Sequence, residues 1–193
     1  AAAGLDKLAH VPTFSFDVDG FLGRLAMAMK QLHPTPKMLY LNFPHNPTAY
    51  VVEPHFNKEV VSLARKNGVC IIQDFAYKDI VFDGYRSPSI LEVPGAKDLA
   101  VEFFTLSKSY NMAGWRMGFC VGNAKMCSAL AKIKGYYDYG HFQAIQIAAI
   151  VALRSPKEVV YEIAKTYETR RNCLIDSLCR IGWPCTPPKA SMF

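Results

Sequence analysis

A lysine and an arginine stand near two hydroxyl groups in the middle of the chain. Thr105 lies near the end of an apolar run, Ser107 and Lys108 follow that run, and Arg116 comes eight residues after the lysine. Arginine binds phosphate through its planar fork of N–H donors, and a desolvated lysine can lose its proton and attack a carbonyl carbon. These side chains therefore suit a ligand that carries both a phosphate and a reactive carbonyl. For Lys108 taken alone, a solvated surface charge remains the simpler explanation.

The segment before Lys108 predicts a strand that brings the lysine to the edge of a sheet. Residues 99–106 form an apolar run that is broken only by Glu102, which is typical of a buried parallel strand. Because the run ends just before Ser107, the lysine lies at the carboxyl end of that strand. Ligands of open α/β sheets bind at this edge. We therefore expect Lys108 to face a ligand site.

Two further predicted strands also end in polar residues. Residues 38–43 lead to Asn46 in a proline-rich turn, and residues 69–72 lead to Asp74 and Tyr77. Each residue has a simpler explanation, because Asn46 could shape the turn, Asp74 could cap a helix and Tyr77 could pack in the core. Together with the lysine they match pyridoxal phosphate. This cofactor needs an imine-forming lysine, an acidic partner for its ring nitrogen, donors to its phenolic oxygen and a phosphate cup.

The segments around these strands predict an α/β fold. Apolar residues recur at helical spacing over residues 20–32, and a second helix begins at Pro54 and ends at Asn67-Gly68. Strand, helix and strand in this order form the βαβ pattern of a parallel sheet. Residues 11–19 alternate loosely between apolar and polar, which predicts an edge strand.

The C-terminal half predicts three more helices. The first two helices span residues 124–134, capped by Asn123, and residues 142–154, with an aromatic loop over residues 135–141 between them. The third helix begins with Ser155 as its cap and Pro156 as its first residue, and it could run to Ile181. A helix of this length often bridges two lobes.

Composition sets broad limits on the function. The 193 residues are 51% hydrophobic, enough for a sizeable core, and the net charge of +6 is spread out, with no basic run longer than Arg170-Arg171. This charge does not distinguish a nucleic-acid partner from an anionic small molecule. No apolar run approaches the length of a membrane span, and residues 1–10 lack a signal-peptide pattern. The six cysteines lack metal-type spacing, which favours a reducing, cytoplasmic setting.

Three motifs resemble those of the class I/II aminotransferases of the pyridoxal-phosphate fold type I. They are Asn46-Pro47-Thr48, Asp74-x-x-Tyr77, and the segment from Ser107-Lys108 to Gly118 that contains Gly114-Trp115-Arg116. The segment Val101-Glu102-Phe103-Phe104-Thr105-Leu106-Ser107-Lys108-Ser109-Tyr110 is most similar to the bacterial glutamate–pyruvate (alanine) aminotransferases.

The resemblance implies a role for each motif residue. Lys108 would form a Schiff base with pyridoxal phosphate and shuttle a proton between the substrate and cofactor carbons. Asp74 would pair with the pyridine nitrogen and keep it protonated, and Tyr77 would hydrogen-bond the phenolic oxygen. These three residues are the expected catalytic set, with no metal. The expected cofactor-binding residues are these three together with Asn46 at the phenolic oxygen and Thr105, Ser107 and Arg116 at the phosphate.

The resemblance also implies an architecture and an assembly. The fold would be a three-layer α/β/α large domain around a mostly parallel sheet, followed by the start of a small α/β domain. Residues 1–154 would belong to the large cofactor-binding domain, and residues 155–193 to a long interdomain helix and the beginning of the small domain. Family members are much longer, so we expect the chain to be part of a longer polypeptide and inactive by itself. A homodimer without nucleic-acid or membrane partners is expected.

The implied activity is transamination between an amino acid, with alanine or glutamate favoured, and a 2-oxo acid. Two alternatives use the same fold: a C–S lyase, and a pyridoxal-phosphate-binding sensor domain of a transcription regulator. Ala49 stands where many relatives have glycine, and the loop over residues 139–143 lacks the expected Thr-x-Pro pattern. In the family this loop projects toward the other subunit's site, so the sequence leaves the substrate preference open.

Overall fold

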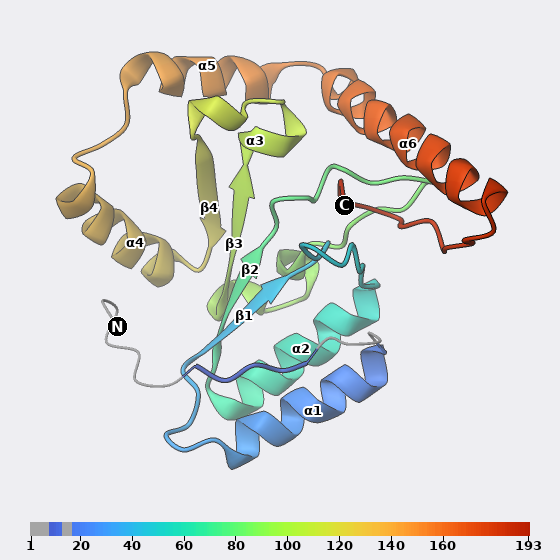
Figure 1. Cartoon of the computed structure of the whole chain (residues 1–193). Helices are drawn as coiled ribbons and strands as arrows, with labels where there is room; N and C mark the ends of the chain where they lie inside the picture. The colour runs from blue at the N-terminus through green and yellow to red at the C-terminus, as the bar shows by residue number, and fades with distance from the viewer. Residues whose placement is uncertain (1–7, 13–16) are drawn as a thin grey trace.

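The computed structural model describes residues 8–12 and 17–193 of the chain. Their centre is a four-stranded sheet in the order β1-β2-β3-β4 (Figure 1). The strands are β1 (Met38–Asn42), β2 (Cys70–Asp74), β3 (Ala100–Thr105) and β4 (Gly118–Gly122). The first three are parallel, and β4 is antiparallel to β3. The predicted α/β class with a mostly parallel sheet is therefore confirmed.

Helix α1 (Val18–Gln31) begins where the sequence predicts a strand. Asp17 caps the helix, because its carboxylate accepts a hydrogen bond from the Gly20 amide at 2.7 Å. The edge strand predicted over residues 11–19 is wrong in its described part, since residues 11 and 12 have no regular structure and Val18 is already helical. Residues 13–16 lie outside the described part. The helix predicted over residues 20–32 is confirmed.

Helix α2 (Pro54–Asn67) follows the sequence signals at both ends. Pro54 occupies the first turn, and Gly68 ends the helix in the left-handed conformation with φ of 66°. A residue with a Cβ would be strained there, which explains the glycine. The strand–helix–strand order predicted for this region is confirmed.

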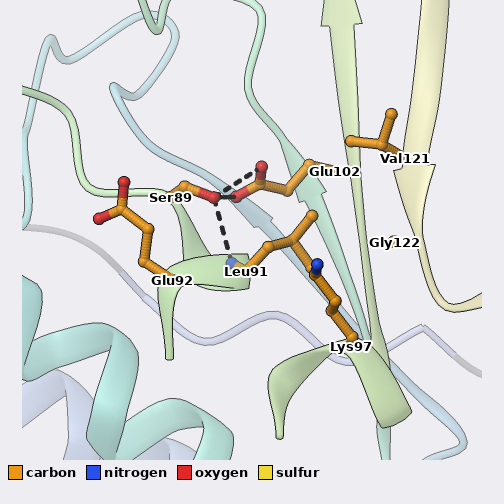
Figure 2. A pocket seen from close by; sticks show the side chains of 7 residues that line it. All are labelled: Ser89, Leu91, Glu92, Lys97, Glu102, Val121 and Gly122. Carbon is orange, nitrogen blue, oxygen red and sulfur yellow. Dashed lines mark hydrogen bonds between the residues drawn. The ribbon is translucent and has the colours of Figure 1, made fainter. Parts of the chain in front are cut away.

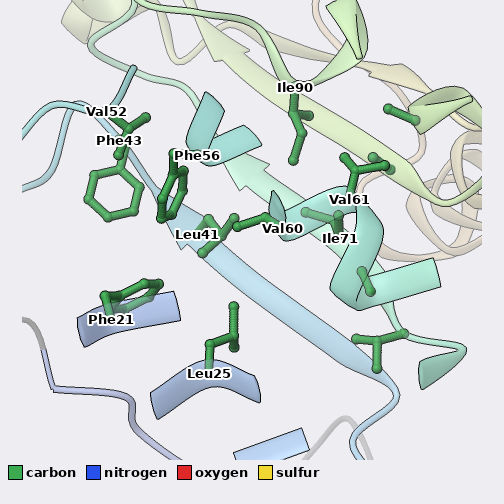
Figure 3. Packing of buried hydrophobic residues seen from close by; sticks show 14 of the residues in the cluster. Phe21, Leu25, Leu41, Phe43, Val52, Phe56, Val60, Val61, Ile71 and Ile90 are labelled. Atoms are coloured by element: carbon green, nitrogen blue, oxygen red, sulfur yellow. The ribbon is translucent and has the colours of Figure 1, made fainter. Parts of the chain in front are cut away.

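The core lies between these two helices and the sheet. Helices α1 and α2 pack side by side against β1 and β2 (Figure 1), and their apolar faces meet those of the strands (Figure 3). Phe56 lies at the centre, with ring centroids 5.8 Å from Phe21 and 5.3 Å from Phe43. The first pair is tilted and the second is edge-on, and aromatic pairs at such distances add to the hydrophobic gain of burial. This core fixes the position of β1 and β2 and therefore of the residues that follow them.

The remaining helices all come after β2 in the chain. They are α3 (Leu106–Ser109), α4 (Ala124–Tyr137), α5 (Gln143–Arg154) and α6 (Lys157–Arg180), with short 3-10 turns η1 (Ile90–Glu92), η2 (Ala96–Asp98) and η3 (Ala113–Trp115). Asn123 caps α4 as predicted, by accepting a hydrogen bond from the Met126 amide. No described helix is both long enough and apolar enough to cross a membrane.

Two predicted boundaries in this half are wrong. Helix α4 continues through residues 135–137, so the aromatic loop begins later than predicted. Pro156, and not Ser155, occupies the cap position of α6. The Ser155 hydroxyl instead donates to the Ala152 carbonyl at 2.6 Å, which closes α5. The serine therefore satisfies an end of the preceding helix rather than the start of the next.

An ion pair fastens the long helix α6 to the loop after β2. The Arg171 guanidinium donates to both carboxylate oxygens of Asp83, at 2.6 and 2.9 Å, and also to the Pro188 carbonyl. The chain after α6 then returns to the same loop, where the Ser191 amide donates to the Ile80 carbonyl at 2.8 Å. These contacts bring the C-terminal residues close to the residues that follow β2 (Figure 1).

We expect Phe56→Ala to destabilise the fold by about 3–5 kcal/mol, because it removes a fully buried ring from the centre of the core. The free energy of unfolding from urea denaturation measures this loss. Phe142→Ala is the matched control, because Phe142 is 72% exposed and its loss should change the free energy by less than about 0.5 kcal/mol. Equal effects of the two substitutions would contradict this description of the core.

Candidate active site

The register of the sheet brings three polar segments to one edge. Asn42 at the end of β1 pairs with Asp74 at the end of β2, and Asp74 pairs with Phe103 near the end of β3. Because these strands are parallel, the residues that follow them leave the sheet on the same side. The predicted juxtaposition of the three strand ends is therefore present in the structure.

An open cleft of about 410 Å³ lies over the ends of β1 and β2. This volume falls in the range of small-molecule sites. Three predicted site residues, Asn46, Asp74 and Tyr77, line the cleft together. The full lining consists of Tyr40, Asn42, His45, Asn46, Asp74, Ala76 and Tyr77.

Asn46 and Tyr77 are joined directly. The Asn46 side-chain amide donates to the Tyr77 hydroxyl at 3.3 Å. Burial is the largest influence on this phenol and raises the pKa of Tyr77; the hydrogen bond from Asn46 acts in the opposite direction, and the charge of Asp74 adds to the rise. Tyr77 therefore keeps its proton at neutral pH and can donate a hydrogen bond into the cleft.

Asn42 holds the turn that carries Asn46, and sequence reasoning missed it. Its side-chain oxygen accepts from the Asn46 amide at 2.8 Å, and its side-chain nitrogen donates to the Asp74 carbonyl at 3.2 Å. Asn42 thus connects the first two strand ends. The available signal was a polar residue at the end of an otherwise apolar strand, beside the proline-rich turn.

Lys108 lies in α3 and faces Tyr77. Its ammonium nitrogen is 5.8 Å from the centroid of the Tyr77 ring, within the range of a cation–π contact. The lysine is half-buried, and α3 is fastened to the loop after β2 because the Ser109 hydroxyl donates to Asp79 at 2.8 Å. The Lys108 side chain therefore does not project into bulk water.

The three predicted phosphate ligands are not assembled into one cup. The Thr105 hydroxyl caps α3 by accepting from the Ser107 amide at 3.1 Å, and it lies 3.4 Å from the Met117 carbonyl. The Arg116 guanidinium donates to the Ala113 carbonyl at 3.1 Å, within its own turn. In the described part of the chain, no hydrogen bond joins Arg116 to Thr105 or Ser107. Thr105 and Ser107 lie close to Lys108 in the chain, whereas the Arg116 guanidinium is bonded within its own turn.

Asp74 has two hydrogen-bond donors, one of which the sequence did not indicate. The Tyr40 hydroxyl donates to Oδ2 at 2.6 Å, and the Ala76 amide donates to Oδ1 at 3.2 Å. The second bond is a local contact with the turn over residues 76–79, so Asp74 is not the helix cap that the simpler interpretation suggested. Partial burial of the hydroxyl in the cleft raises the pKa of Tyr40 strongly, although much of the ring is exposed, and the hydrogen bond and charge of Asp74 raise it further.

The C-terminal residue Phe193 also reaches this region. Its ring packs edge-on against Tyr77, with centroids 5.4 Å apart. The contact depends on the return of the chain after α6 to the loop after β2. No local sequence signal reports such a contact, because residues far apart in the sequence make it.

A second hollow of about 480 Å³ lies beside β3 and β4 (Figure 2). Its lining residues are Ser89, Leu91, Glu92, Lys97, Glu102, Val121 and Gly122. The Glu102 carboxylate is 1% exposed and accepts from the Ser89 hydroxyl and the Ile90 amide at 2.7–2.9 Å. These bonds fasten η1 to β3, so the carboxylate has a structural role. We place the candidate site in the smaller cleft, where polar groups face open space.

Comparison with known proteins identifies a family model and several relatives. Residues 3–193 match the family model described as aminotransferase class I and II. The chain is 53% identical over 173 residues to the glutamate–pyruvate aminotransferase AlaC of Escherichia coli, which covers 90% of this chain and 42% of the relative. It is 41% identical to LL-diaminopimelate aminotransferase 2 of Nostoc sp., over 90% of this chain and 44% of the relative. The chain thus spans less than half the length of these curated relatives.

Solved structures of aminotransferases also resemble this chain. The chain resembles the aromatic aminotransferase from Pyrococcus horikoshii with a TM-score of 0.83 and 26% identity, over 95% of this chain and 49% of that one. It resembles a probable N-succinyldiaminopimelate aminotransferase from Thermus thermophilus with a TM-score of 0.76 and 39% identity, over 82% of this chain and 42% of that one.

We expect the stability difference between the wild type and Glu102→Gln to depend on pH. Burial raises the pKa of Glu102 above its ordinary value of 4.5, in spite of the hydrogen bonds from Ser89 and the η1 amides. The folded state thus holds this proton more strongly than the unfolded state does. The stabilisation is full below the ordinary pKa and is lost as the pH rises through the folded value.

Urea denaturation measures this effect between about pH 4 and about pH 7. The free energy of unfolding of the wild type minus that of Glu102→Gln should fall as the pH rises, because glutamine does not titrate. Glu59→Gln, at an exposed position on α2, controls for the loss of a surface charge. A difference that stays constant with pH would show that burial does not penalise the Glu102 charge.

Proposed function

This chain belongs to the class I and II aminotransferases, and we propose on that basis that it carries the pyridoxal-phosphate site of an enzyme that moves amino groups between amino acids and 2-oxo acids. The observation that carries the proposal is the position of the Lys108 amine over the ring of Tyr77, a residue that lines one cleft together with Asn46 and Asp74. An amine, a phenol, an amide and a carboxylate at one sheet edge are the groups that this cofactor requires.

The chemistry of the cleft fits the ring of the cofactor. When bound, pyridoxal phosphate supplies a carbonyl that condenses with amines and an aromatic ring that takes up electrons. The Asp74 carboxylate would accept a hydrogen bond from the protonated ring nitrogen and would stabilise its positive charge. Asp74 has room for this bond, because each carboxylate oxygen can accept two donors.

Tyr77 and Asn46 would hold the phenolic oxygen. Tyr77 accepts from Asn46, so its own proton is free to point into the cleft. Its raised pKa keeps that proton in place at neutral pH. The two residues would therefore present donors to an anionic oxygen, with Asn42 holding the turn that carries Asn46.

Lys108 would anchor the cofactor and carry protons. Its amine is held near the cleft by the fastening of α3 to the loop after β2. An amine released from covalent attachment at this position can take a proton from one carbon and return it to another, which is general acid–base catalysis. The contact with the Tyr77 ring keeps the amine within the cluster.

Thr105, Ser107 and Arg116 would bind the phosphate. Support comes from the position of Thr105 and Ser107 at the start of α3 and from the exposed guanidinium of Arg116. Arg116 would have to exchange its bond to the Ala113 carbonyl for the phosphate. Arginine gains from this exchange, because a bidentate ionic contact is stronger than a neutral one.

The substrate pair and the assembly are also proposals. The 53% identity to AlaC, which is named as a glutamate–pyruvate aminotransferase, supports alanine or glutamate as amino donor. A homodimer is supported by the apolar side chains that α5 exposes, namely Ile147, Ile150 and Val151. Six free cysteines support a cytoplasmic setting. We further propose that residues 1–154 form part of the large domain and that residues 155–193 lead into the small one.

We expect Lys108→Ala in the full-length protein to lower kcat by at least about 10⁴-fold, because both the covalent anchor and the proton carrier are lost. Steady-state assays with alanine and 2-oxoglutarate measure this loss. Spectra of the half-reaction with alanine alone distinguish a transferase from a C–S lyase or a sensor domain. A variant that keeps wild-type turnover would refute the role of Lys108.

Borohydride reduction of the cofactor-loaded protein gives a second, direct readout. We expect the peptide that contains Lys108 to carry the added mass of the cofactor, and the peptide that contains Lys78 not to carry it. Lys78 is the matched control, because it lies in the turn after β2 and pairs with Asp79 at 3.0 Å. Labelling of Lys78, or of no lysine, would contradict the assignment.

We expect the 193-residue chain by itself not to sustain transamination, because it spans only 42% of the length of AlaC. Turnover by this chain, assayed beside the full-length protein with the same substrates, tests the expectation. Comparable turnover numbers for the two would overturn it.

A further inference from the structure

We propose that Tyr40 is a positioning residue whose hydroxyl holds the Asp74 carboxylate in the orientation that receives the cofactor's ring nitrogen. The inference rests on the proposed function and extends it to a residue outside the three motifs. Tyr40 lies on β1, whereas Asp74 ends β2. The contact between them depends on the fold and not on any local sequence pattern.

The register of the two strands makes this contact possible. Tyr40 pairs with Ile72, and Asn42 pairs with Asp74, so the Tyr40 side chain reaches Asp74 along the diagonal of the sheet. Diagonal neighbours are within reach of long aromatic side chains. The hydroxyl meets Oδ2 at 2.6 Å, a distance typical of an O–H donor bound to a carboxylate.

The two oxygens of Asp74 are held from different sides. Oδ1 accepts from the Ala76 amide, which follows in the same turn, and Oδ2 accepts from Tyr40. The Asp74 carbonyl is held in addition by the Asn42 side chain. The local contact at Oδ1 alone would leave the carboxylate free to rotate about the Cβ–Cγ bond. Tyr40 removes that freedom before any ligand arrives, which is the preorganisation that a binding site requires.

Tyr40 contributes little to the packing of the fold. Its side chain is 63% exposed, and it also lines the cleft that Asp74 faces. Its raised pKa means that the phenol stays protonated and remains a donor throughout the neutral range. A tyrosine that is exposed, protonated and hydrogen-bonded to a site carboxylate is better explained by its effect on that carboxylate than by burial of its ring.

The test compares Tyr40→Phe with the wild type in the full-length protein, using pyridoxal phosphate as the probe. We expect the Kd of the cofactor to rise about fivefold, because the orientation of Asp74 is lost while the ring of residue 40 remains. In an Asp74→Ala background, Tyr40→Phe should cause no further loss. Tyr161→Phe on α6, at a residue that is 62% exposed, is the matched control and should leave the Kd unchanged.

A spectroscopic readout separates positioning from a structural effect. With ¹⁵N in the cofactor ring, the nitrogen signal of Tyr40→Phe should move toward that of the neutral ring, while Tyr161→Phe keeps the wild-type signal. This readout decides the question even if the Asp74 variant fails to fold. An unchanged nitrogen signal and an unchanged Kd in Tyr40→Phe would overturn the inference. An equal loss of cofactor affinity from Tyr40→Phe in the wild type and in the Asp74→Ala background would also overturn it. A wild type that binds no cofactor at Lys108 would instead refute the proposed function, and the inference with it.

Discussion

Parallel pairing of the first three strands is the constraint on which the candidate site depends. Asn42, Asp74 and Phe103 lie level with one another across β1, β2 and β3, so the chain leaves each strand at the same edge. A shift of one residue in this register would turn Asp74 to the other face of the sheet. The aromatic core around Phe56 opposes such a shift, because α1 and α2 hold β1 and β2 from one face. Stability and site geometry therefore depend on the same contacts.

The site itself is a connected hydrogen-bond network. Tyr40 holds one oxygen of Asp74, Asn42 joins the Asp74 carbonyl to the turn that carries Asn46, and Asn46 reaches the Tyr77 hydroxyl. Such networks are strongest when every member is satisfied. The ring-binding half of the proposed site is thus held together by hydrogen bonds within this chain. The phosphate-binding half is not, because Arg116 is bonded within its own turn.

Sequence reasoning was correct for features that depend on the local order of residues along the chain. The βαβ pattern, the caps of α2 and α4, and the approach of Lys108 to Tyr77 all follow from residue types and strand ends. It failed where the outcome depends on competing local contacts, as at Asp17, which caps a helix that begins at Val18 within the segment predicted as a strand. It could not find Tyr40, because the reach of that hydroxyl depends on the register between two strands. The direction of Arg116 depends on its left-handed backbone, with φ of 53°, which the sequence does not report.

The central claim is that the ends of three parallel strands serve one cofactor. A crystal structure of the full-length protein loaded with pyridoxal phosphate tests it most directly. We predict continuous electron density from the Lys108 side chain into the cofactor, with the ring nitrogen within hydrogen-bond distance of Asp74. A cofactor attached to another lysine, or one whose ring nitrogen faces solvent away from Asp74, would contradict the account.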